Sequence, residues 1–125
     1  MITEDYASFE TAKLLKEKGF DEICYLGYNK NGEYVPTSNR TNSQIIQPDF
    51  CFICCPTLQM AMKWLREIYS LEIYPYHDFP KAGDKWWFEI IKYPNSVSEH
   101  ESETAYNTYE QACEEAIKYC LENLI

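Results

Sequence analysis

Three cysteines, Cys51, Cys54 and Cys55, have the only spacing in the chain that resembles a metal or redox site. A structural zinc site needs four ligands, commonly supplied by two such pairs, and the second pair is missing. His77 could supply one further ligand. A redox Cys-x-x-Cys normally opens a helix, whereas this one lies in an apolar, strand-like segment. We therefore predict buried thiols and no cofactor, and keep as an alternative a small metal-binding protein built on Cys51, Cys54 and His77.

The two histidines give no support to catalysis. Neither His77 nor His100 stands beside a recognisable nucleophile motif, and His100, between two glutamates, is predicted to be a surface residue. The four glycines form no cluster that could bind a phosphate. We predict that the protein is not an enzyme and assign no catalytic residue.

Aromatic residues before and within one strongly apolar segment are the best candidates for a binding surface. A strand with tryptophans on both faces needs a helix on one face, and on the other a second layer, a partner or a ligand. Core packing of the same side chains is the alternative interpretation. The predicted binding residues are Tyr74, Tyr76, Phe79, Trp86 and Trp87.

The formal net charge of −9 argues against direct nucleic-acid binding, because phosphate contacts need basic residues. Anionic membranes are disfavoured for the same reason. An acidic surface suits a basic partner, or a mimic of nucleic acid that inhibits a DNA-binding enzyme. The acidic face for that second alternative would consist of Glu99, Glu101, Glu103, Glu110 and Glu114.

Three helices are predicted to position these residues. The first covers residues 8–20, with Ser8 as its N-cap and Gly19 at its end. The central helix covers residues 57–70, whose apolar residues recur at helical spacing. The last one follows a capping box of Thr108 and Gln111.

The segments between the helices are strand-like. We expect an internal strand at 49–55, an edge strand at 71–76 because of Pro75, a central strand at 85–93 and a polar edge strand within 97–106. A hairpin is expected at 23–35, followed at 36–48 by a long loop or a hairpin with a mobile tip. These elements predict a single α+β domain over residues 1–125, in which an antiparallel sheet packs with three helices.

The sequence also hints at an internal repeat. Residues 13–17 and 63–67 share Lys-x-Leu-(Lys/Arg)-Glu, and in both copies a Glu-Ile pair follows at the same spacing. A helix-plus-hairpin pseudo-repeat would explain this. From Thr57 onward the predicted order is helix, three antiparallel strands and helix, an order also found in double-stranded RNA-binding domains, but the acidic last helix contradicts that function.

Nothing in the sequence points to export. The N-terminal residues carry acids where a secretory signal needs bases, and no apolar segment approaches the roughly 20 residues of a membrane span. We therefore expect a cytoplasmic protein whose six cysteines are thiols.

Residues 8–22, 56–67 and 109–116 resemble segments of a group of short, uncharacterised bacterial and prophage proteins. The resemblance covers roughly the three helices and contains no catalytic motif. It implies a mobile-element or accessory setting, with no activity to transfer. The leading hypothesis is thus a small non-enzymatic interaction protein that binds a protein partner; a homodimer is also compatible with the sequence.

Overall fold

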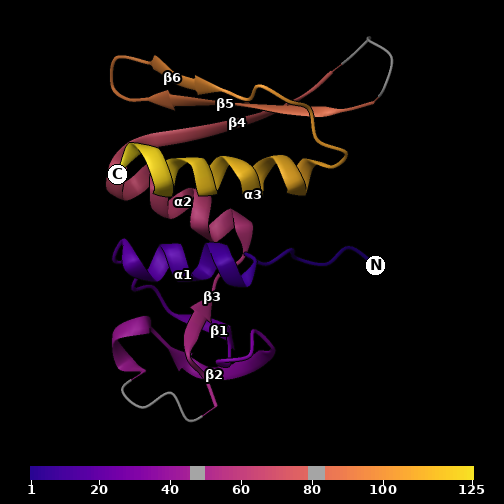
Figure 1. Cartoon of the computed structure of the whole chain (residues 1–125). Helices are drawn as coiled ribbons and strands as arrows, with labels where there is room; N and C mark the ends of the chain where they lie inside the picture. Colours follow the sequence, from indigo (N-terminus) through magenta and orange to yellow (C-terminus); the bar gives the residue numbers. More distant parts are fainter. Residues whose placement is uncertain (46–49, 79–83) are drawn as a thin grey trace. The chain divides into compact units, whose positions relative to one another are not determined.

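The structure is a computed structural model that describes residues 1–45, 50–78 and 84–125. The chain divides into two compact units, residues 1–61 and 62–125, and each unit is described by itself (Figure 1). The described residues form three α-helices and two three-stranded antiparallel sheets, so the predicted α+β class is confirmed. The division of the strands between two sheets was not predicted. The single domain and the pseudo-repeat stay predictions.

Helix α1 (Phe9–Glu17) begins and ends at the predicted signals. The Ser8 hydroxyl accepts the N–H of Thr11 at 3.2 Å, which satisfies one of the free amides of the first turn. Gly19 has a φ of +94°, and the Phe20 N–H donates to the Leu15 carbonyl at 2.9 Å. This pattern ends the helix and directs the chain into the first sheet.

The sheet of the first unit has β1 (Cys24–Tyr28) between β2 (Tyr34–Arg40) and β3 (Ile53–Cys55). Its hairpin turn is closed by Asn29, whose Oδ1 accepts the N–H groups of Asn31 and Glu33. A core of apolar side chains joins α1 to this sheet. Its buried members are Ala12, Tyr28, Ile53 and Cys55.

Two predictions for this unit are wrong: the loop at 36–48 and the internal position of the strand at 49–55. Residues 36–40 of the predicted loop belong to β2, and Asn42–Gln44 form a short 3₁₀ helix. An edge strand tolerates Pro36, and the Thr37 hydroxyl anchors β2 by donating to the Cys24 carbonyl. Residues 46–48 lie outside the described residues.

The strand predicted to be internal, β3, lies at an edge of its sheet. Helix α1 packs against it, and a side chain accepts one of the N–H groups on its open edge. That side chain is Asn42, whose Oδ1 accepts the Cys54 N–H at 2.9 Å and whose Nδ2 donates to the Phe20 carbonyl at 2.9 Å.

The carboxylate of Asp21 holds the neighbouring 3₁₀ turn. It accepts the Ser43 N–H at 2.7 Å and the Ser43 hydroxyl at 2.8 Å, and these two hydrogen bonds lower the pKa of Asp21. A lowered pKa means that the carboxylate stabilises the fold above its ordinary pKa. That contribution is lost as the pH falls through the lowered value.

We expect Asp21→Asn to make the free energy of unfolding of the first unit depend less on pH in the acidic range. The effect should be small, since Asp21 is exposed and solvent screens it. Urea unfolding between about pH 7 and about pH 3 measures it. Glu22→Gln, an exposed neighbour, is the control, and an unchanged pH slope in Asp21→Asn would contradict the assignment.

Helix α2 (Leu58–Tyr69) starts in the first unit and continues into the second. The Thr57 hydroxyl caps it by accepting the Met60 N–H at 3.1 Å. The second unit continues with β4 (Leu71–His77), β5 (Trp86–Lys92) and β6 (Val97–Glu101). The sheet order β4-β5-β6 confirms the predicted central strand and both predicted edges.

Helix α3 (Tyr109–Tyr119), followed by a π-helical turn at Cys120–Leu124, packs against β4 and β5 (Figure 1). The Thr108 hydroxyl accepts the Gln111 N–H, and Gln111 Oε1 accepts the Asn107 N–H, so the predicted cap is confirmed. We call the sheet face against α3 the inner face, where Ile73, Phe88 and Ile90 are buried. The opposite one is the outer face. Within the described residues no helix is long and apolar enough to cross a membrane.

Candidate functional site

The outer face of the second sheet gathers three of the five predicted binding residues. Tyr76 on β4 lies directly opposite Trp87 on β5, and Tyr74 lies opposite Glu89. Tyr74 is 47% exposed, Tyr76 is 44% exposed and Trp87 is half-buried. In Figure 1, α3 runs along the other face of this sheet. The second unit therefore presents aromatic rings on a face that its own α3 does not cover.

Trp86 does not belong to this surface. Consecutive strand residues point to opposite faces, so Trp86 lies on the inner face when Trp87 lies on the outer one. Its ring contacts those of His77 and Tyr109, with centroids 5.1 and 5.3 Å apart. Trp86 thus packs near the start of α3. Phe79, the fifth predicted residue, lies outside the described residues.

Two carboxylates border the aromatic pair. Glu89 on β5 lies directly opposite Glu101 on β6, and like charges at such positions destabilise a sheet. The Ser98 hydroxyl donates to Glu89 at 2.8 Å. Glu72, at the other edge, pairs with Arg66 at 3.3 Å, but no Lys or Arg within the described ranges forms an ion pair with Glu89 or Glu101.

The surroundings of this surface raise the pKa of two tyrosine hydroxyls. Partial burial raises the pKa of Tyr76, and the carboxylates of Glu101, Glu89 and Asp78 raise it further. The hydroxyls of Tyr74 and Tyr93 share a hydrogen bond of 2.9 Å, which raises the pKa of Tyr93. An aromatic surface at negative potential can bind a cation through the ring faces and the carboxylates together.

The predicted acidic face does not form one array. Glu101 lies on the outer face of the sheet, whereas Glu110 and Glu114 belong to α3, which packs against the inner face. Glu99 and Glu103 are exposed in and just after β6, and Glu114 is half-buried. The carboxylates proposed to mimic phosphates are therefore divided between two sides of the second unit.

The cysteines are packed as predicted: all six are free thiols and all are buried. In the first unit the thiols of Cys54 and Cys55 donate to the carbonyls of Arg40 and Ala7, each at 3.3 Å. Burial raises the pKa of Cys51, and the Cys24 thiol lowers that of Cys54 by hydrogen bonding to it. Among the residues that the structure describes, no three His, Cys, Asp or Glu side chains are grouped to hold a metal ion.

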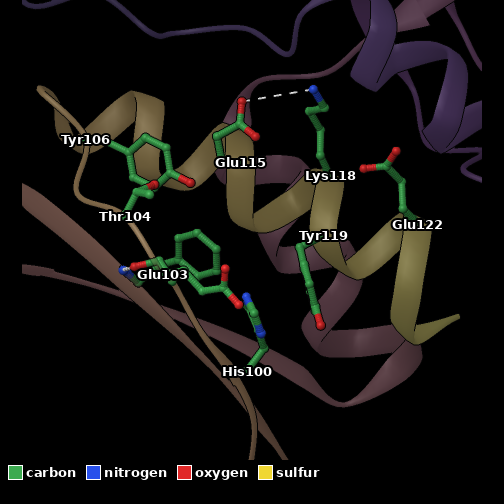
Figure 2. A pocket seen from close by; sticks show the side chains of 10 residues that line it. His100, Glu103, Thr104, Tyr106, Glu115, Lys118, Tyr119 and Glu122 are labelled. Atoms are coloured by element: carbon green, nitrogen blue, oxygen red, sulfur yellow. Dashed lines mark hydrogen bonds and ion pairs between the residues drawn. The ribbon is translucent and has the colours of Figure 1, made fainter.

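A pocket of about 290 Å³ lies in the second unit between the end of β6 and α3 (Figure 2). His100 lines it from β6, and its ring stacks on that of Tyr119 with centroids 3.7 Å apart and planes 8° apart. The prediction of an ordinary surface histidine is thus wrong, because His100 is half-buried against α3.

Sequence reasoning missed Glu89 and the stacked pair. Glu89 could have been found, since it follows Trp87 by two residues in a strand and so shares its face. No sequence signal connects His100 with Tyr119, which belong to different elements.

Comparison of the chain with family models, curated proteins and solved structures finds no match in any of the three.

Proposed function

We propose that the chain is a small, non-enzymatic, cytoplasmic binding module that uses the outer face of its second sheet to bind a basic segment of a protein partner. One observation carries this proposal: Glu89 and Glu101 oppose each other beside the Tyr76–Trp87 pair, where no described cation compensates them. A bound Lys or Arg would relieve the repulsion. The mobile-element setting implied by the resemblance remains a prediction.

The charge of the surface favours a basic partner over a second copy of the chain. A dimer that joined two outer faces would bring the Glu89 and Glu101 pairs of both copies together, which electrostatics opposes. A segment with Lys or Arg can instead place its cations on the carboxylates and its alkyl stems on the exposed tyrosine and tryptophan rings.

Binding of the full chain to a synthetic peptide of alternating Arg and Ser tests the proposal by calorimetry. We expect Trp87→Ala to weaken binding about thirtyfold, as truncation of a central aromatic anchor does. Glu89→Gln with Glu101→Gln should weaken it about tenfold through the loss of charge-assisted hydrogen bonds. A peptide with Gln in place of Arg should not bind.

The matched control is Glu17→Gln with Glu22→Gln, which removes the same charge from exposed positions of the first unit. If this control weakens binding as much as the outer-face pair, general attraction to an acidic chain explains the result and the proposal fails. Folding is checked with Glu101→Gln alone, which removes the opposed charge. Its free energy of unfolding should rise by about 0.5 kcal/mol while peptide binding falls.

A further inference from the structure

We propose that the pocket between β6 and α3 is a second binding site, selective for a guanidinium group. Its lining residues include none of the outer-face residues Tyr74, Tyr76, Trp87, Glu89 and Glu101. The inference therefore stands or falls separately from the proposed function. Figure 2 shows Glu103, Thr104 and Tyr106 on the strand side of the pocket, Glu115, Lys118 and Tyr119 on α3, and Glu122 on the π-helical turn that follows α3.

Aromatic rings form the apolar part of this pocket. Phe88, 2% exposed, lines it, and the Tyr106 ring stacks on that of Phe88 with centroids 6.1 Å apart and planes 20° apart. The rings of His100 and Tyr119, which stack in nearly parallel planes, add a second set of flat surfaces. Flat rings in a concave site suit a planar group that can lie against a ring face.

The polar groups of the pocket select for positive charge. Glu103, Glu115 and Glu122 are three carboxylates against the single ammonium of Lys118, which lies 4.0 Å from Glu115. The carboxylates come from both sides of the pocket, so a cation bound between them would contact strand and helix together.

A guanidinium fits this combination better than other small groups. It is planar, it stacks on aromatic faces, and its N–H groups can bind two carboxylates in a forked arrangement. A neutral polyol could use the hydroxyls but would leave the excess of carboxylates uncompensated. A primary ammonium would balance charge without using the flat ring surfaces. The guanidinium could belong to a free small molecule or to an arginine side chain of a protein.

Two probes distinguish these sources: agmatine, a free guanidino compound, and a blocked Gly-Arg-Gly tripeptide. Each is titrated into the ¹⁵N-labelled full chain and followed by NMR. We expect saturable shifts centred on residues 100–122 for at least one probe. Tighter binding of agmatine supports a small-molecule ligand, and tighter binding of the tripeptide supports an arginine side chain; both outcomes support the guanidinium site.

The decisive variants are Glu103→Gln with Glu122→Gln, for which we expect affinity for the better probe to fall about tenfold. Glu110→Gln is the matched control, because Glu110 is an exposed carboxylate of α3 that does not line the pocket. It should leave affinity unchanged. A tripeptide with citrulline, which has the same shape without the charge, should not bind.

The inference would be overturned by no saturable binding of either probe, by equal binding of the citrulline tripeptide, or by an equal loss in Glu110→Gln. Binding that is insensitive to the Glu103 and Glu122 changes but lost in Glu101→Gln would also overturn it. That pattern would place the probe on the outer face and leave the proposed function intact.

Discussion

Asn42→Ala is expected to destabilise the first unit by about 3 kcal/mol, because it removes one hydrogen bond from each of two backbone groups at a buried site. The Asn42 side chain is 8% exposed and joins the Phe20 carbonyl to the Cys54 N–H, with both hydrogen bonds at 2.9 Å. Alanine provides neither a donor nor an acceptor, and the site is too buried for water to replace both. Hydrogen exchange of the Cys54 amide, followed by NMR, measures the effect directly.

Asn95→Ala is the matched control, since Asn95 is exposed in the turn between β5 and β6. Surface changes of this kind usually alter the free energy of unfolding by less than about 0.5 kcal/mol. If the two variants cost the same, Asn42 does not hold the end of α1 to β3. Asn42→Asp should also be destabilising, because its carboxylate can still accept the Cys54 N–H but would lie against the Phe20 carbonyl oxygen at a buried site.

Gly27→Ala is expected to cost about 3 kcal/mol or more, through overpacking in the middle of the first sheet. A Cβ at this position would lie 2.5 Å from Cys51 Sγ, 2.5 Å from the Ile53 carbonyl oxygen and 2.9 Å from Thr37 Cγ2. The Ile53 oxygen belongs to the paired strand β3, so it cannot move away without breaking the sheet. Urea unfolding of the first unit, followed by circular dichroism, measures the cost.

Gly19→Ala separates this clash from the general cost of replacing glycine. A Cβ at Gly19 would meet nothing within 4 Å, but the φ of +94° makes alanine unfavourable there by about 1 kcal/mol. We therefore expect Gly27→Ala to be clearly the more damaging of the two. Equal effects would mean that β1 and β3 can separate at low cost, contrary to the close packing around Gly27.

Local signals made the helices predictable. Ser8, Thr57 and Thr108 each cap a helix by accepting a hydrogen bond from the residue three positions later, so a short stretch of sequence is enough to predict where each helix begins. Pro75 placed β4 at an edge for the same reason. The error at β3 had a long-range cause, because Asn42 accepts an N–H group on the open edge of β3 and nothing in the sequence connects it with Cys54.

Contacts between residues far apart in the sequence were also the part of the candidate sites that could not be predicted. Alternation along β5 could separate Trp86 from Trp87 in advance, but the opposition of Glu89 and Glu101 depends on register. A register shift between Ile90 and Ile91 interrupts the pairing of β5 with β6. The stack of His100 on Tyr119 needs both a sheet edge and a helix in place. Composition predicted an acidic, aromatic surface, and tertiary structure decided which carboxylates meet.

The buried thiols give each unit its own chemical reporter. Cys24, Cys51, Cys54 and Cys55 belong to the first unit, and Cys113 and Cys120 belong to the second. Burial raises the pKa of Cys113 to about 11 and that of Cys120 to about 12, so both are protonated at neutral pH and poor nucleophiles. An alkylating reagent reacts with such a sulfur only after its surroundings open. Labelling rates of the native cysteines therefore record the opening equilibria of the two halves separately, without any introduced probe.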